Sequence, residues 1–269
     1  MTNEIDHRGR TALVTGASSG IGAAFARTLA ARGSTVVLVA RREAELTRLA
    51  TELHRAHGVA THVVVADLSA PDAAEQVAAA VADLGLEVDV LVNNAGFSAY
   101  GPFVAADPRR DRDMITVGTT AYVGLTHQFL PAMVARGDGV VVNVSSAGAF
   151  QALPYQLVYS ATKAFVQAFT EGLWAENRGS GVRITAVCPA AVDTEYFQVL
   201  GGHEEAAFGR PISPDRVVEA ALDAVDRDRM YTVVGLRWKV TVWSLRLFTR
   251  RRNALTYERL SRPRVRAAA

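Results

Sequence analysis

The chain has 269 residues, of which 49% are apolar, and a formal net charge of +2. This length is sufficient for one large α/β domain with a full hydrophobic core. The single cysteine excludes an intrachain disulfide framework, and no apolar run of about eighteen residues predicts a membrane-spanning helix. The first ten residues are polar and charged, with no secretory signal, so we expect a cytoplasmic protein.

The charge is divided unevenly along the chain. Residues 237–269 contain ten Lys and Arg but only one acid, Glu258, and therefore carry +9. The remaining residues carry −7, and an acidic body gives no reason to expect nucleic acid as a partner. We predict one domain over residues 1–236, followed by a basic, apolar helical extension over residues 237–269.

The regular structure begins with a strand, a glycine-rich turn and a helix. Residues 11–15 are a short apolar run of β type, and a helical pattern extends to Arg32. The glycines between them allow a tight turn and close approach of a ligand, and the helix N-terminus offers unpaired N–H groups to a pyrophosphate. The residues of this predicted cofactor loop are Gly16, Ser18, Ser19, Gly20, Ile21 and Gly22.

A second predicted strand, residues 35–40, ends at Arg41 and Arg42. In dinucleotide-binding folds an acid near the end of this strand binds the adenosine ribose, whereas a basic residue suits a 2′-phosphate. Arginine is a good bidentate partner of phosphate. These residues favour NADPH over NADH. The alternative is that both arginines lie on the surface and pair with Glu43 and Glu45.

Strands and helices alternate along the rest of the chain, and nearly half of the residues are apolar, as a sheet covered on both faces requires. The further strands are predicted at 61–66, 88–92, 140–144, 182–187 and 231–234. The further helices are predicted at 43–57, 72–84, 111–135, 157–177 and 214–226. Residues 195–211 are predicted to form a mobile lid.

The helix at 157–177 places Tyr159 and Lys163 on one face, because they are four residues apart. A phenol is a poor acid–base group at neutral pH, but a nearby ammonium favours the phenolate. The pair can therefore act as an acid toward a carbonyl or as a base toward an alcohol. Ser146 follows the buried strand at 140–144, at the carboxyl edge where open α/β sheets place their sites.

The order and spacing of these motifs resemble the classical short-chain dehydrogenase/reductase family over about residues 9–235. The motifs are the turn from Thr15 to Gly22, the segment Asn93-Asn94-Ala95-Gly96, Ser146, and Tyr159-x-x-x-Lys163. The resemblance implies a Rossmann-type, doubly wound parallel sheet of about seven strands in a single three-layer α/β/α domain. It also implies NADPH-dependent reduction of a carbonyl to an alcohol, or the reverse.

The resemblance further implies a role for each site residue. Ser146 and Tyr159 would bind the carbonyl oxygen, Tyr159 would donate the proton, and Lys163 would bind the nicotinamide ribose. Asp67 would lie beside the adenine amine, although it could instead order a turn. Asn93 is expected to stabilise the sheet rather than to touch substrate. The remaining residues assigned to the cofactor are Leu68, Asn93, Ala95, Gly96, Pro189, Val192 and Thr194.

Two positions depart from the family pattern. Ala190 replaces a glycine, which would cost about 1 kcal/mol or more if that position required a positive φ. Gly118 stands where the family has an asparagine that helps to shape a helix kink and a water-filled proton relay. Either a backbone carbonyl holds the relay water, or the protein has moved to another task, as a slow reductase, a non-redox tailoring enzyme or a cofactor-binding protein. The presence of Ser146, Tyr159 and Lys163 favours the reductase.

Other segments of the sequence bear on the substrate, on metal binding and on oligomeric state. Apolar residues of the predicted lid favour a hydrophobic ketone or aldehyde as substrate: Tyr196, Phe197, Val199, Leu200 and Phe208. No set of histidines has ligand spacing near an acid cluster, so no metal is expected. In relatives, the long helix and the helix carrying Tyr159 often form a dimer interface, which predicts a homodimer or homotetramer. The alternative is that the apolar faces of these helices belong to the internal core.

The extension permits two interpretations. Residues 238–248 are apolar on nearly every side, and Arg250, Arg251 and Arg252 follow. Such a helix can lie in a membrane interface with its arginines on anionic headgroups. It can also pack on the acidic body or across a dimer, with its arginines paired to acids. Packing is favoured, because helices that are apolar all round are usually buried.

Overall fold

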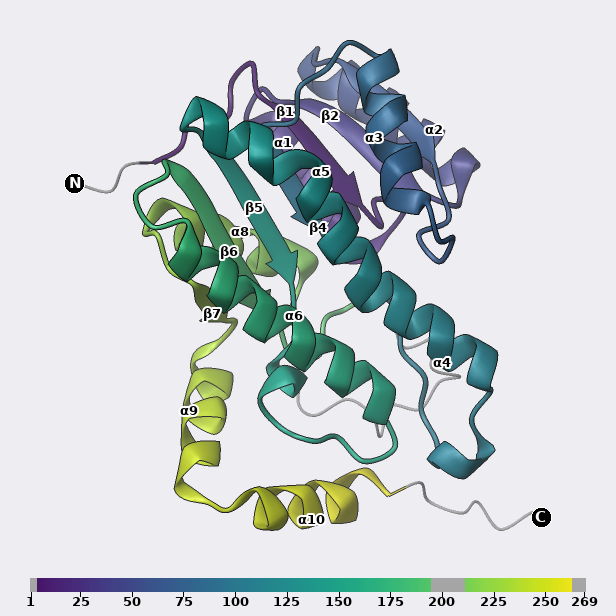
Figure 1. Cartoon of the computed structure of the whole chain (residues 1–269), viewed down its shortest axis with the longest axis vertical. Coiled ribbons are helices and arrows are strands. Elements are labelled where there is room, and N and C mark those ends of the chain that lie inside the picture. The colour runs from purple at the N-terminus through teal and green to yellow at the C-terminus, as the bar shows by residue number, and fades with distance from the viewer. Residues whose placement is uncertain (1–3, 195–210, 263–269) are drawn as a thin grey trace.

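The computed structural model describes residues 4–194 and 211–262. Seven parallel strands form one sheet in the order β3-β2-β1-β4-β5-β6-β7, and helices cover both faces of it (Figure 1). The strands are β1 Thr11–Thr15, β2 Thr35–Ala40, β3 Thr61–Val65, β4 Val90–Asn93, β5 Gly139–Val144, β6 Val182–Cys188 and β7 Tyr231–Val233. The predicted doubly wound fold is confirmed.

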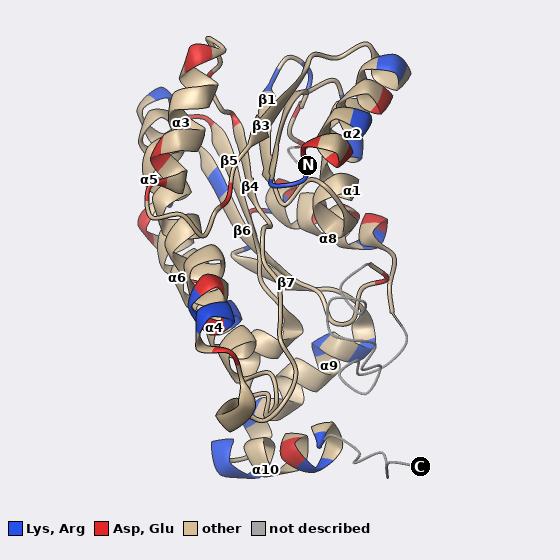
Figure 2. Ribbon diagram, turned by 90° about the vertical axis from the view of Figure 1, so that its right-hand side faces the viewer, with Lys and Arg blue, Asp and Glu red and all other residues tan. Residues whose placement is uncertain are grey.

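Two helical layers enclose the sheet. Helices α1, α2 and α8 lie on one face, and α3, α5 and α6 lie on the other (Figure 2). The helices are α1 Gly20–Ala31, α2 Glu43–His57, α3 Ala73–Asp83, α4 Pro108–Ile115, α5 Ala121–Arg136, α6 Leu157–Glu176, α8 Pro214–Asp226, α9 Leu236–Ser244 and α10 Arg250–Ser261. Because both faces are covered, the central strands can be apolar without alternation, and all six residues of β5 are buried.

A polar network lies within this apolar core. The amide of Asn93 on β4 donates to the Asn143 side-chain oxygen on β5 at 3.0 Å. The Asn143 amide donates in turn to the Thr170 hydroxyl on α6 at 2.9 Å. Asn93 is fully buried, so it stabilises the sheet as expected.

The predicted long helix at 111–135 is interrupted. Helices α4 and α5 are joined by a π-helical turn, Thr116–Thr120, which contains the buried Gly118. A β-carbon at Gly118 would lie only 3.1 Å from the Thr162 Cβ on α6. Glycine therefore lets this turn approach α6 closely, and the irregularity expected from the family's asparagine is present without that side chain.

The C-terminal extension consists of α9, a 3-10 turn at Leu245–Leu247, and α10, and it crosses the end of the domain that lies lowest in Figure 1. One side of the extension packs against the body of the domain. The Tyr155 hydroxyl donates to the Glu258 carboxylate at 2.8 Å, and the Tyr100 hydroxyl donates to the Ser261 carbonyl. Val242 and Tyr257 are buried. The prediction that the extension packs on the body is confirmed for this side.

The accompanying prediction that its arginines pair with acids of the body is wrong for the residues described. In residues 237–262 the ion pair is formed by Arg262 and Glu258, both near the end of α10. None of the described helices is long and apolar enough to cross a bilayer. The predicted lid lies, except for its last residue, outside the described residues, as do the apolar side chains assigned to it.

Gly118→Asn should lower the free energy of unfolding by about 1–3 kcal/mol, because the new side chain overpacks the contact with Thr162. Gly172→Asn is the matched control, since a β-carbon at this glycine of α6 would meet nothing within 4 Å. Denaturant unfolding of both variants measures the difference. Equal losses in the two variants would contradict a packing role for Gly118.

Candidate active site

A cleft of about 790 Å³ lies along the carboxyl ends of the strands. This is the edge at which open α/β sheets bind their ligands. It gathers segments that are far apart in the sequence. The predicted site residues that line it are Gly16, Ser18, Ser19, Gly20, Ile21, Arg41, Arg42, Asp67, Leu68, Ala95, Gly96, Ser146, Tyr159, Lys163, Pro189, Val192 and Thr194.

The glycine turn after β1 is held by Asn94. The Asn94 amide donates to the Thr15 carbonyl at 2.8 Å, and its backbone N–H donates to the Thr15 hydroxyl at 2.9 Å. Gly16 and Gly20 have φ values of +64° and +55°, which favour glycine. The turn therefore presents the N-terminus of α1 to the cleft, as pyrophosphate binding requires.

Two predicted cofactor residues do not line the cleft. Asn93 faces the interior of the sheet, whereas its neighbour Asn94 reaches the glycine turn. Gly22 lies behind the turn, where a β-carbon would be 2.3 Å from the Gly16 carbonyl oxygen. Its contribution is close packing of α1 against the turn rather than contact with a ligand.

The two arginines after β2 lie at one end of the cleft. Arg42 donates from Nε to the Ser18 hydroxyl at 3.1 Å, and Arg41 lies 3.9 Å from the Asp67 carboxylate. Asp67 accepts hydrogen bonds from the backbone N–H and the hydroxyl of Ser69, and the backbone bond is the main reason why the pKa of Asp67 is lowered. Asp67 thus orders a turn, as the alternative interpretation proposed, while still lining the cleft.

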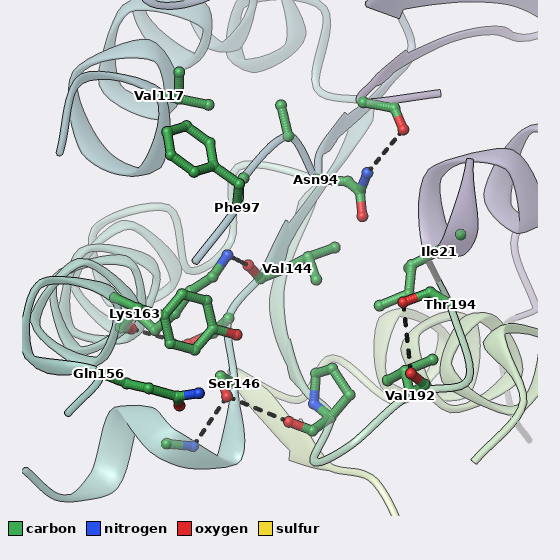
Figure 3. Close-up of a pocket in the computed structure, with 18 of the residues that line it drawn as sticks. Ile21, Asn94, Phe97, Val117, Val144, Ser146, Gln156, Lys163, Val192 and Thr194 are labelled. Atoms are coloured by element: carbon green, nitrogen blue, oxygen red, sulfur yellow. Dashed lines mark hydrogen bonds between the residues drawn. The ribbon is translucent and has the colours of Figure 1, made fainter. Parts of the chain in front are cut away.

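Ser146, Tyr159 and Lys163 line the same cleft, and Figure 3 shows Ser146 and Lys163 near each other in it. Ser146 stands two residues beyond β5, and its hydroxyl accepts the Gly148 N–H at 3.0 Å and donates to the Pro189 carbonyl at 3.5 Å. Tyr159 and Lys163 come from the first turns of α6. The predicted convergence of these three side chains is present in the structure.

The Lys163 amine is the most deeply buried charge of the cleft. Lys163 is 5% exposed, and its Nζ donates to the Val144 carbonyl at 2.7 Å. The same nitrogen lies 5.9 Å from the centre of the Tyr159 ring. Burial lowers the pKa of Lys163 to about 8, so the amine is largely protonated at neutral pH and loses its charge as the pH rises through that value.

Backbone contacts fix the strand ends on which these residues stand. The Ser145 hydroxyl donates to the Lys163 carbonyl at 2.9 Å, joining the end of β5 to α6. The backbone N–H groups of Ser145 and Ala147 donate to the Val187 and Pro189 carbonyls, joining it to β6. The positions of Ser146 and Lys163 are therefore set by secondary structure.

The segment after β6 crosses toward the glycine turn. A β-carbon added at Gly20 would lie 3.0 Å from the Thr194 methyl carbon, so Thr194 packs close to the turn. Ala190 is not among the described residues with positive φ; the non-glycine examples are Tyr155 and Asp228. The strain considered for alanine at this position does not arise.

Sequence reasoning missed three residues at the other end of the cleft. Gln156 is 9% exposed, and its Nε2 is buried without a hydrogen-bond partner; its side chain lies beside Ser146 (Figure 3). Trp238 and Tyr257 come from the extension. Gln156 directly precedes α6 and lies three residues before Tyr159, and this closeness in sequence was an available signal. No local pattern links Trp238 or Tyr257 to the cleft.

Comparison with known proteins agrees with this geometry. The family model described as short chain dehydrogenase matches residues 10–205. The very-long-chain 3-oxoacyl-CoA reductase of Anas platyrhynchos is 36% identical over 222 residues, which are 81% of this chain and 69% of that protein.

Solved structures are similar over nearly the whole chain. A 7β-hydroxysteroid dehydrogenase has a TM-score of 0.84 at 29% identity, covering 95% of this chain and 99% of that one. A short-chain dehydrogenase from Sphingobium yanoikuyae in complex with NADPH has a TM-score of 0.79 at 34% identity, covering 97% and 98%. The chain therefore belongs to the short-chain dehydrogenase family and is an NAD(P)-dependent oxidoreductase acting on CH–OH or C=O groups.

Proposed function

We propose that this enzyme uses NADPH to reduce a hydrophobic ketone or aldehyde to an alcohol, or catalyses the reverse reaction. The observation that carries this proposal is the convergence of Ser146, Tyr159 and the buried amine of Lys163 on one part of the cleft. A hydroxyl, a phenol and an ammonium are the groups needed to bind a carbonyl oxygen and to move a proton to it.

The cleft has the features needed to hold a dinucleotide. Gly16 lets the turn pack tightly against the segment after β4, since a β-carbon there would lie 2.7 Å from the Asn94 amide nitrogen. The N-terminus of α1 and the turn would hold the pyrophosphate. Arg41 and Arg42 would bind the 2′-phosphate, together with Ser18, which already contacts Arg42. The NADPH-bound relative supports this choice of cofactor.

The chain's own residues would supply position and a proton. When bound, the nicotinamide gives or takes the hydride. As a donor, the Ser146 hydroxyl makes a long bond to the Pro189 carbonyl, at 3.5 Å, and can turn this proton to the substrate oxygen. Tyr159 would donate its proton to that oxygen in reduction. The ammonium of Lys163 would stabilise the phenolate that remains.

The missing family asparagine is compatible with this mechanism. The irregular turn at Thr116–Thr120 forms without it, and the Lys163 amine is held by a backbone carbonyl, that of Val144. These observations favour the interpretation in which backbone groups support the proton relay. Membership of the short-chain dehydrogenase family also supports the reductase over a non-redox enzyme or a cofactor-binding protein on the same fold.

The substrate end of the cleft indicates a chemical class. Phe97, Val117, Trp238 and Tyr257 form apolar walls, whereas Gln156 offers an amide N–H that has no acceptor in the protein. A buried donor without an acceptor is costly, so a ligand oxygen would satisfy it. We infer a hydrophobic carbonyl compound with a second acceptor oxygen near the reacting group.

We also propose that the enzyme is a homodimer or homotetramer. Apolar side chains on α5 and α6 are unusually exposed, including Val134, Leu157 and Phe165. Phe165 stacks on Phe169 along α6 at 5.8 Å between ring centres. A second copy covering these helices would remove this surface from water.

The proposed function is tested by Tyr159→Phe, which keeps the ring and removes the proton donor. Turnover of a panel of ketones and aldehydes, followed by NADPH absorbance, should fall by about 10²–10⁴, the range for a general acid, and NADPH binding should be nearly unchanged. Tyr231→Phe, a change of the same kind outside the cleft, should retain activity. Unchanged turnover in Tyr159→Phe, or NADPH binding by the wild type without turnover of any carbonyl, would contradict the proposal.

Arg41→Ala should weaken NADPH binding by about 1.5–3 kcal/mol, the value of one charged hydrogen bond, and leave NADH binding almost unchanged. Arg48→Ala is the matched control, because Arg48 lies farther along α2 and pairs with Glu45. Titration of both cofactors by calorimetry gives the comparison. Equal losses for NADPH and NADH would exclude recognition of the 2′-phosphate by Arg41.

A further inference from the structure

The extension has an inner and an outer face. On the inner face, Val242 and Tyr257 are buried. On the outer face, α9 and the turn after it expose Leu236, Val240, Trp243 and Leu247, at steps of four, three and four residues. These four side chains are 57–78% exposed. Their spacing places them along one helical face, and Phe248, which is 45% exposed, continues this apolar strip.

Basic side chains flank the strip. Residues 237–262 contain eight Lys and Arg and the single acid Glu258, and basic segments lie on both α9 and α10 (Figure 2). Among the described residues, the ion pair of this segment is Arg262 with Glu258, while Arg252 lies over the Phe248 ring at 4.7 Å. The extension therefore keeps most of its positive charge, although the body carries a net negative charge.

The position of the arginines adds to this imbalance. Arg250, Arg251 and Arg252 form the first turn of α10, and this first turn contains no acidic residue. The positive end of the helix dipole disfavours cations there. An external anionic surface would offset this repulsion. Exposed apolar side chains alone would not identify a partner. Their combination with arginines that have no acidic partner among the described residues indicates a partner that is both apolar and anionic.

We propose that α9, the following turn and the start of α10 form a docking face for an anionic lipid surface. The apolar strip would enter the boundary between headgroups and acyl chains, and the arginines would contact lipid phosphates. Because no described helix can span a bilayer, the protein would lie on the surface. A second copy is a poorer occupant, since an isologous contact would bring two positively charged extensions together.

Co-sedimentation of the full-length protein with lipid vesicles tests the proposal. Vesicles of phosphatidylcholine containing phosphatidylglycerol should bind the protein at low salt, and vesicles of phosphatidylcholine alone should bind it much less. Added salt should release it, because exposed charges are screened. Brominated lipids should quench part of the tryptophan fluorescence in the wild type, and Trp243→Phe should remove that quenching.

Two variants separate the apolar and electrostatic contributions. Leu247→Glu should abolish binding, whereas Leu84→Glu, the same change at an exposed leucine after α3, should not. Arg250→Ala with Arg251→Ala should weaken binding by about fivefold for each arginine, from about 1 kcal/mol per charge. Arg55→Ala with Arg229→Ala removes the same charge from the body and should change binding little. Thermal unfolding of each variant confirms that it is folded.

Three results would overturn the proposal. One is the absence of binding to phosphatidylglycerol vesicles at low salt. Another is equal binding by the Leu247→Glu and Leu84→Glu variants. The third is a lower oligomeric mass of Leu247→Glu by light scattering without lipid, which would assign the face to a second copy. None of these readouts depends on catalysis, so the docking face and the proposed reductase activity fail or stand separately.

Discussion

The burial of the Lys163 amine is the constraint on which the rest of the cleft depends. An ammonium taken out of water requires a partner, and the Val144 carbonyl supplies it at 2.7 Å, at the end of β5. That bond holds the first turns of α6 against the sheet edge, and the Ser145 hydroxyl adds a second bond at the same strand end by donating to the Lys163 carbonyl. Tyr159 is carried on the same turns, so its position relative to Ser146 is fixed by two hydrogen bonds between strand and helix.

Most of the fold and the central part of the cleft could be predicted from the sequence, because their signals are local. Apolar runs give buried strands, and a spacing of four places Tyr159 and Lys163 on one face. Sequence alone does not decide which of Asn93 and Asn94 faces the core. Adjacent residues at the end of a strand point in opposite directions, so a shift of one residue exchanges their roles. Here Asn93 faces Asn143 in the core and Asn94 reaches the glycine turn.

The parts that sequence did not predict are contacts between distant segments. The close approach of Gly118 to Thr162 depends on how two helices pack, and helical periodicity does not record a π-helical turn. Trp238 and Tyr257 enter the cleft only because the extension folds back over it. The expected pairing of its arginines failed for a similar reason, since opposite net charges on two segments do not bring particular side chains within bonding distance.

Tyr155 links the extension to the cleft, because it contacts α10 and directly precedes Gln156, which lines the cleft. This residue has a φ of +66°, a region that costs a non-glycine residue of the order of 1–3 kcal/mol. Contacts that oppose this cost include the bond from its hydroxyl to Glu258 on α10 and the packing of its ring against Tyr100, at 6.2 Å between ring centres. Tyr155 directly precedes Gln156, whose amide faces the cleft. The backbone of this segment is also held by the Gly101 N–H, which donates to the Tyr155 carbonyl, and by the Gln156 N–H, which donates to the Leu153 carbonyl. Helix α10 therefore adds one further contact to the segment that carries Gln156.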